Sequence, residues 1–144
     1  MAYSTDVEAA KRLAERIHEG QTDKAGNAYI THPQREAARL TTPQEQVVGW
    51  LHDTVEDTPL TLGEVAARFG PETAAAVDAI SRRDGEAWDD YIERVKQNPI
   101  ARRVKVSDLI DNSNLSRLPR VTMKDVQRQA KYNRALETLL TEPI

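Results

Sequence analysis

Hydrophobic side chains recur at steps of three and four residues in several segments of the chain. This spacing places them on one face of an α-helix, because a helix turns by about 100° per residue. The clearest series are Val7, Ala10, Leu13 and Ile17; Val48, Leu51 and Val55; and Ile100, Val104 and Leu109. Alternation of apolar and polar residues, which is typical of β-strands, persists in no segment. The pattern predicts an all-α fold in which each helix buries one face.

Capping signals predict where the helices begin. Three threonines are followed three residues later by a glutamate, the spacing of a capping box, in which hydroxyl and carboxylate bind the free amides of a helix start. The pairs are Thr5 and Glu8, Thr42 and Glu45, and Thr61 and Glu64. Helices are therefore expected near residues 5–19, 33–40, 43–57, 61–69, 71–81, 87–97, 99–112 and 122–140. We therefore expect these helices to form a compact bundle of seven or eight short helices.

The chain has 144 residues, which fits one domain at about 150 residues per domain. No repeat, low-complexity tract or long linker divides it, so residues 1–144 are expected to form a single domain. No apolar run approaches the ~18 residues of a membrane span, and the first residues include no apolar segment typical of a secretion signal. We therefore expect a cytoplasmic protein with no membrane partner.

The composition restricts the chemistry further. Cysteine is absent, which excludes thiolate catalysis, iron–sulfur clusters and zinc–thiolate sites. Any metal must therefore be held by histidine and carboxylate side chains. The formal net charge is −3, which argues against a nucleic-acid partner. An anionic ligand would need a local basic pocket.

One predicted helix concentrates polar residues with metal-binding chemistry. His52, Asp53, Glu56 and Asp57 fall on one sector of that helix, beside its apolar stripe. Three carboxylates so close together, with no lysine or arginine among them, repel one another. A bound cation would remove this repulsion. The alternative is a solvated acidic face at a helix end.

Two further segments offer potential ligands. His32 precedes Pro33 and is one of only three histidines; the alternative is a surface histidine near a helix start. Lys105, Asp108 and Asn112 share one face of a largely apolar helix, where an unpaired carboxylate would be very costly. Either a metal ion or an ion pair, with Lys105 or with an arginine from another helix, would compensate Asp108. Histidine with carboxylate suits Mn²⁺, Fe²⁺, Co²⁺ or Zn²⁺ better than Mg²⁺.

Four blocks follow one another in order along the chain. They are His18-x-Gly20-Gln21-x-x-Lys24-x-Gly26, His32-Pro33, the segment from His52 to Thr58, and the segment from Val104 to Asp108 with Asn112. This set closely resembles the HD-domain phosphohydrolases, above all the hydrolase domain of the RelA/SpoT group and the small alarmone hydrolases. The resemblance covers the chain from about Ala9 to Leu140.

The resemblance implies a function and a site. The group typically uses Mn²⁺ and removes the 3′-pyrophosphate of (p)ppGpp, leaving GDP or GTP. Carried over position by position, the implied ligands of one divalent metal are His32, His52, Asp53 and Asp108. The implied acid pair that positions the attacking water and handles protons is Glu56 and Asp57. The implied contacts to the nucleotide substrate are Lys24, Lys105 and Asn112.

Two substrate-side positions depart from the group's pattern. Alarmone hydrolases commonly carry an arginine before the lysine, available to stack on guanine, but this chain has Asp23 before Lys24. The usual His-Asn pair after the metal aspartate is Asp111-Asn112 here. Arg117 is a candidate for the missing cation. We therefore predict a metal-dependent phosphohydrolase acting on (p)ppGpp. The alternatives are an HD phosphohydrolase for another nucleotide or phosphate ester, and a nucleotide-binding HD module without catalysis.

Overall fold

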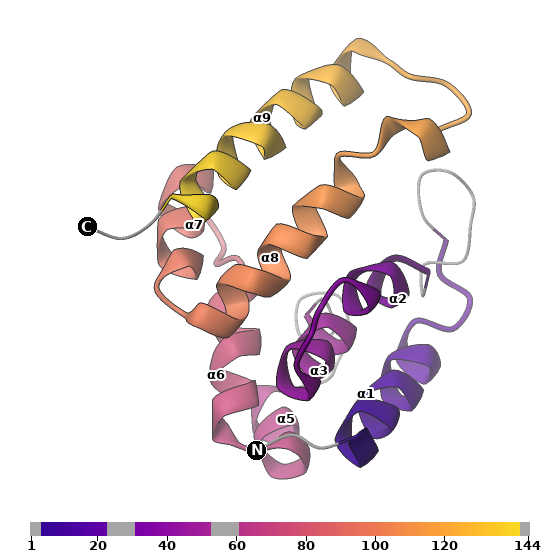
Figure 1. Ribbon diagram of the computed structural model, residues 1–144, viewed down its shortest axis with the longest axis vertical. Helices are drawn as coiled ribbons and strands as arrows, with labels where there is room; N and C mark the ends of the chain where they lie inside the picture. Colours follow the sequence, from indigo (N-terminus) through magenta and orange to yellow (C-terminus); the bar gives the residue numbers. More distant parts are fainter. Residues whose placement is uncertain (1–3, 23–30, 53–60, 142–144) are drawn as a thin grey trace.

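The computed structural model describes residues 4–22, 31–52 and 61–141. Within these ranges the chain forms eight α-helices and one 3₁₀ helix and no β-strand, which confirms the predicted all-α fold (Figure 1). The helices are α1 (Ser4–Ile17), α2 (Thr31–Ala38), α3 (Pro43–Leu51), α5 (Leu62–Phe69), α6 (Pro71–Ile80), α7 (Trp88–Lys96), α8 (Pro99–Asn112), the 3₁₀ helix η1 (Leu115–Arg117) and α9 (Met123–Leu140).

The capping residues explain most helix starts. Thr42 and Thr61 accept hydrogen bonds from the backbone N–H groups three residues on, as predicted. The expectation for Thr5 was wrong, because α1 already includes Ser4. A complete capping box that the sequence did not predict lies at the start of α9, where Asp125 takes the place of the usual glutamate after Thr122. Short polar side chains at these positions therefore set the helix boundaries.

Gly70 joins α5 to α6. Its φ of 95° lies in a region that favours glycine, and its N–H donates to the carbonyl of Ala66, closing α5. Pro71 then begins α6, at a position where proline loses no hydrogen bond. Gly70 therefore ends α5 and leads directly into α6.

Helix α8 lies at the centre of the bundle. It packs against α2 and α3 on one side and against α9 on the other, and it also contacts α6 and α7 (Figure 1). Val104 and Leu109 of α8 are fully buried, as are Leu51 of α3 and Leu139 of α9. Burying each of these side chains contributes about 1.5–3 kcal/mol. Because the apolar residues of α8 are buried, the polar residues of α8 that face α2 and α3 also lie in the interior.

A glycine allows α2 and α3 to approach closely. A Cβ atom at Gly49 of α3 would lie 3.5 Å from the Cα atom of Ala37 in α2 and 2.9 Å from Cδ1 of Leu40. An alanine here would require the Leu40 side chain to shift, and it would already touch the backbone of Ala37. Gly49 therefore lets the C-terminal part of α3 lie close to the C-terminal end of α2.

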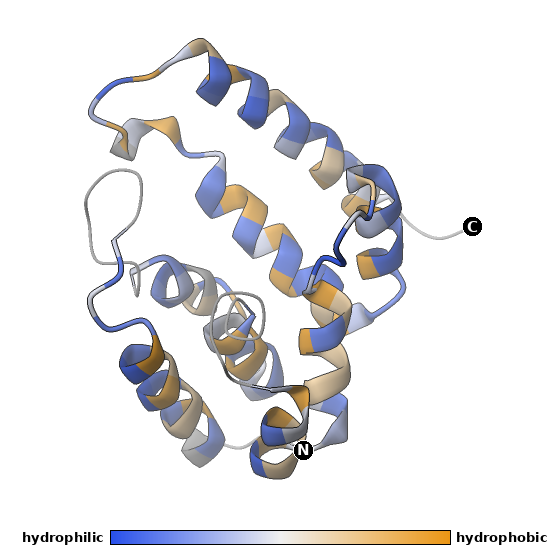
Figure 2. Ribbon diagram, turned by 180° about the vertical axis from the view of Figure 1, so that it is seen from behind, coloured by the Kyte–Doolittle hydropathy of each residue, from blue (hydrophilic) through white to orange (hydrophobic). Residues whose placement is uncertain are grey.

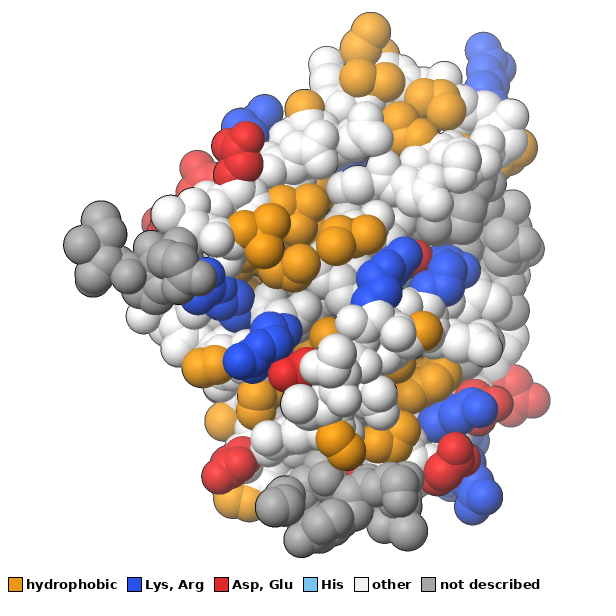
Figure 3. All heavy atoms as spheres, in the orientation of Figure 1, with side chains coloured by type: hydrophobic (Ala, Val, Ile, Leu, Met, Phe, Trp, Pro, Cys, Tyr) orange, Lys and Arg blue, Asp and Glu red, His pale blue; other side chains and the backbone are white. Residues whose placement is uncertain are grey.

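The molecular surface mixes charged and apolar side chains. Hydrophilic and hydrophobic residues are interleaved along the helices (Figure 2), and one face shows hydrophobic side chains beside lysines and arginines (Figure 3). A pocket on the surface is lined by Arg39, Arg102, Arg103, Val106 and Ile110, among others. In the part of the chain that the structure describes, no helix has the length and apolar character needed to cross a membrane.

Candidate metal centre

Three elements bring two histidines and an aspartate together. His32 lies in the first turn of α2, His52 is the C-cap of α3 and Asp108 belongs to α8. One potential ligand atom from each of the three side chains lies within 4.8 Å of the other two. All three residues are buried, so the alternative of a surface histidine at position 32 is wrong.

Both imidazoles present the same nitrogen to Asp108. Nε2 of His32 lies 3.0 Å from Oδ1 of Asp108, and Nε2 of His52 lies 3.5 Å from the same oxygen. The opposite nitrogen of each ring is held by a neighbour: Nδ1 of His52 donates to the carbonyl of Gly49 at 2.9 Å, and Nδ1 of His32 to Asp111 at 2.6 Å. Metal-binding histidines typically show this arrangement, in which the second nitrogen fixes the ring.

Asp108 is surrounded by donors. Lys105 donates to Oδ2 of Asp108 at 2.7 Å and Asn112 donates to Oδ1 at 3.0 Å. Burial disfavours the charged carboxylate, but the Lys105 ammonium and the hydrogen bonds from His32 and His52 outweigh it, so the pKa of Asp108 lies well below its ordinary value. The ion pair with Lys105 that the sequence left open is therefore present, together with the two histidines.

Asp111, which departs from the pattern of the related group, also belongs to the site. It is fully buried, and besides His32 it accepts hydrogen bonds from Nε of Arg35 at 2.7 Å and Nη2 of Arg35 at 3.0 Å. Burial opposes ionisation, but His32 and Arg35 hold the pKa of Asp111 below its ordinary value. The sequence feature that could have identified Asp111 is its position three residues after Asp108, which places both on the same helix face.

The structure describes only some of the other predicted site residues. Lys105 and Asn112 lie at the cluster, where each donates a hydrogen bond to Asp108. Arg117 is the last residue of η1, on the segment after α8. The remaining predicted site residues, Lys24, Asp53, Glu56 and Asp57, lie outside the described residues.

The donor set fits a divalent transition metal. Two imidazole nitrogens and a carboxylate match the ligand preference of Mn²⁺, Fe²⁺, Co²⁺ and Zn²⁺. The anchored Nδ1 atoms direct both rings at one point, so little reorganisation is needed to bind an ion. The buried cluster of His32, His52 and Asp108 is thus a possible metal site.

Comparison with known proteins identifies the family. The model of the HD domain family matches residues 10–98, which include His32 and His52. A GTP pyrophosphokinase of Streptomyces coelicolor is 35% identical over 92% of this chain. A guanosine-3′,5′-bis(diphosphate) 3′-pyrophosphohydrolase of Aquifex aeolicus is 30% identical over 76% of it. The matched regions make up only 16% and 18% of these relatives.

A solved structure shows the same fold over nearly the whole chain. It belongs to a metazoan ortholog of SpoT described as hydrolysing ppGpp, and it matches with a TM-score of 0.79 at 20% identity, covering 97% of this chain and 88% of the other. The bifunctional (p)ppGpp synthase/hydrolase SpoT of Escherichia coli is 34% identical over 60% of this chain and 13% of its own length. The chain belongs to the HD domain family and is related to the RelA/SpoT (p)ppGpp hydrolase domains.

Proposed function

We propose that this protein is a Mn²⁺-dependent phosphohydrolase that removes the 3′-pyrophosphate of (p)ppGpp. The observation that carries the proposal is the convergence of His32 and His52 on Asp108, with both rings anchored through Nδ1. The relation to alarmone hydrolases supports the choice of substrate. Since that substrate is an intracellular nucleotide, the protein is expected to act in the cytoplasm.

His32, His52 and Asp108 would hold the metal, with Asp53 as the fourth ligand. Lys105 and Asn112 orient Asp108 by donating to its two oxygens. A divalent ion bound there would supply a Lewis acid that activates water and polarises a phosphoryl oxygen. Mn²⁺ is the ion expected from the family resemblance.

Glu56 and Asp57 carry the proton transfers. One carboxylate accepts a proton from the water that attacks the phosphorus bonded to O3′, and the other donates a proton to O3′ as the phosphorus–oxygen bond breaks. Pyrophosphate leaves, and GDP or GTP remains. Side chains placed for general acid–base catalysis typically contribute about 10²–10⁴-fold in rate.

The substrate is held by cations and an amide around the cluster. Lys24, Lys105 and Arg117 neutralise phosphate charge, which is the principal task of a protein in phosphoryl transfer, and Asn112 contacts the nucleoside. Asp23 stands where alarmone hydrolases commonly have an arginine. A carboxylate does not stack on a guanine ring as a guanidinium does, so guanine is held differently here.

A substrate panel tests the proposal. The Mn²⁺-loaded protein is incubated with ppGpp, GTP, GDP and GMP, and the products are separated by anion-exchange chromatography. We expect ppGpp to give GDP and pyrophosphate faster than any other nucleotide reacts. Faster hydrolysis of GTP, GDP or GMP would identify that nucleotide as the substrate and reject the alarmone assignment.

A further inference from the structure

Three cationic side chains surround one indole ring next to the metal centre. Nζ of Lys131 in α9 lies 4.1 Å from the ring centroid of Trp88, Nζ of Lys105 lies 5.6 Å from it, and Cζ of Arg82 lies 5.7 Å from it. Tyr132 packs against the same ring, with centroids 5.8 Å apart. An indole attracts a cation, but three cations around one ring also repel one another.

Lys131 bears the clearest sign of this repulsion. Burial lowers the pKa of Lys131, and the charges of Arg82, Lys105 and Arg128 lower it further, while Asp89 acts in the opposite direction. Within residues 4–22, 31–52 and 61–141, no carboxylate forms an ion pair with Lys131. A negatively charged ligand would relieve the repulsion that the folded chain leaves in place.

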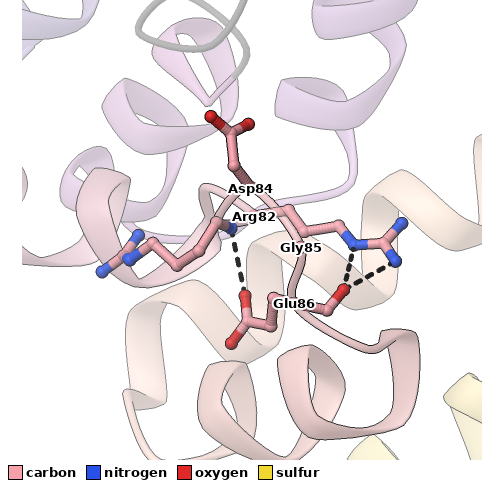
Figure 4. Close-up of a pocket in the computed structure, with 5 residues that line it drawn as sticks. Arg82, Asp84, Gly85 and Glu86 are labelled. Carbon is pink, nitrogen blue, oxygen red and sulfur yellow. Dashed lines mark hydrogen bonds between the residues drawn. The ribbon is translucent and has the colours of Figure 1, made fainter.

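Arg82 is held in place by the loop that precedes α7. Its Nε and Nη2 atoms donate to the backbone carbonyl of Glu86 at 3.2 and 2.9 Å (Figure 4). Arg94 also stabilises this loop, because it donates to both carboxylate oxygens of Glu86. The guanidinium is therefore positioned before any ligand arrives.

Lys105 connects this group of cations to the metal centre. Its Nζ atom donates to Asp108 at 2.7 Å and lies beside the same indole ring as Lys131. From their distances to the ring centroid, the ammonium groups of Lys105 and Lys131 lie within about 10 Å of each other, a range over which charges interact at moderate salt. A ligand with two separated anionic groups can therefore contact both regions.

We infer that Lys131 and Arg82, arranged around Trp88, form a second phosphate subsite that binds the 5′-phosphates of the nucleotide whose 3′-pyrophosphate lies at the metal centre. The inference rests on the proposed function for the choice of 3′ and 5′ groups. The charges and their arrangement independently point to a phosphorylated ligand. The ammonium of Lys131 and the guanidinium of Arg82 are both cationic donors, and proteins commonly use such groups to bind phosphate.

Equilibrium binding of GDP tests the subsite without any catalysis. GDP carries the 5′-diphosphate and no 3′ group, and isothermal titration in EDTA measures its affinity for the native protein. Lys131→Gln and Lys131→Met remove the charge, Lys131→Arg keeps it, and Lys124→Gln is the control, because Lys124 is an exposed lysine in the first turn of the same helix. Circular dichroism checks that each variant is folded.

We expect Lys131→Gln and Lys131→Met to weaken GDP binding about 10-fold or more, as for loss of a charged hydrogen bond. Lys131→Arg and Lys124→Gln should stay within about 2-fold of the native protein. In kinetic assays, Lys131→Gln should raise KM for ppGpp and leave KM for guanosine 3′-diphosphate unchanged. These results support the subsite, and the GDP result does so even if ppGpp is not hydrolysed.

Two outcomes overturn the subsite. One is GDP binding that Lys131→Gln weakens no more than Lys124→Gln does, and the other is a native protein that does not bind GDP. If ppGpp is hydrolysed in either case, the proposed function stands and only the second subsite is rejected.

Discussion

Asp111 accepts a hydrogen bond from Nδ1 of His32 at 2.6 Å, while Nε2 of the same ring faces Asp108 at 3.0 Å. Asp108 and Asp111, two carboxylates about one helical turn apart on α8, therefore contact the two ring nitrogens of one imidazole. Arg35 donates two hydrogen bonds to Asp111, so its negative charge is compensated inside the protein. The direction of His32 depends on Asp111 as much as on the backbone of α2.

We predict that Asp111→Asn weakens metal binding about 10–100-fold, the usual effect of losing the partner of a metal-binding histidine. The amide keeps the size of the side chain but removes the charge opposite Arg35. Titration of Mn²⁺ into the metal-free protein measures the change. Asp90→Asn, an exposed aspartate of α7, is the matched control, and equal affinities in the two variants would mean that Asp111 has no role in placing His32.

Asp108→Asn should abolish metal binding. In the native protein, an ion at 100 times its Kd adds about 2.7 kcal/mol to the free energy of unfolding, which raises Tm by about 5–10 °C for a domain of this size. The variant should show no such rise, because the shared carboxylate is lost. Thermal melts with Mn²⁺ and with EDTA make the comparison, and a full rise in Asp108→Asn would remove this residue from the ligand set.

Glu56→Gln separates binding from catalysis. If Glu56 handles a proton, the variant should keep its metal and lose at least about 10²-fold in kcat. Metal content by atomic absorption and turnover of ppGpp are measured on the same sample. Turnover close to that of the native protein would make Glu56 a structural residue.

Glu86 predicts a pH dependence of stability. Hydrogen bonds from the Arg94 side chain and from the Arg83 backbone lower the pKa of Glu86 from 4.5 to about 2. Because the folded state favours the ionised form, its stabilisation is complete above pH 4.5 and disappears as the pH falls through about 2. Glu86→Gln should therefore be less stable than the native protein at pH 7 and equally stable near pH 2.

Urea unfolding at the two pH values measures this difference. Glu93→Gln, at an exposed position on α7, controls for the loss of one charge. A destabilisation by Glu86→Gln that is the same at both pH values would show that the carboxylate is not the source of the effect.

The sequence predicted most of the helices well because their signals are local. The helix expected over residues 43–57 instead ends at Leu51, with His52 as its C-cap. Apolar spacing and the caps at Thr42 and Thr61 act within one or two turns, so they can be read from neighbouring residues. The start of α9 was placed correctly, but its capping box was missed, because Asp125 replaces the usual glutamate. The 3₁₀ helix η1 lies in a segment that the pattern left unassigned.

The site was predicted only in part, because its contacts are distant in sequence. His32, His52 and Asp108 were found from motif order, and the structure brings them together. The bond between His32 and Asp111 joins residues 79 positions apart, which no local pattern reveals. The cations around Trp88 come from the loop before α7, from α8 and from α9, so their proximity follows only from packing.

Hydrolysis of ppGpp with and without metal tests the account most directly. Metal-free protein is supplied with Mn²⁺ or with EDTA, and GDP and pyrophosphate are quantified over time, with Asp108→Asn as the matched inactive variant. The account predicts both products in equal amounts in the Mn²⁺ sample alone. Intact ppGpp in a native sample that has bound Mn²⁺ would contradict it.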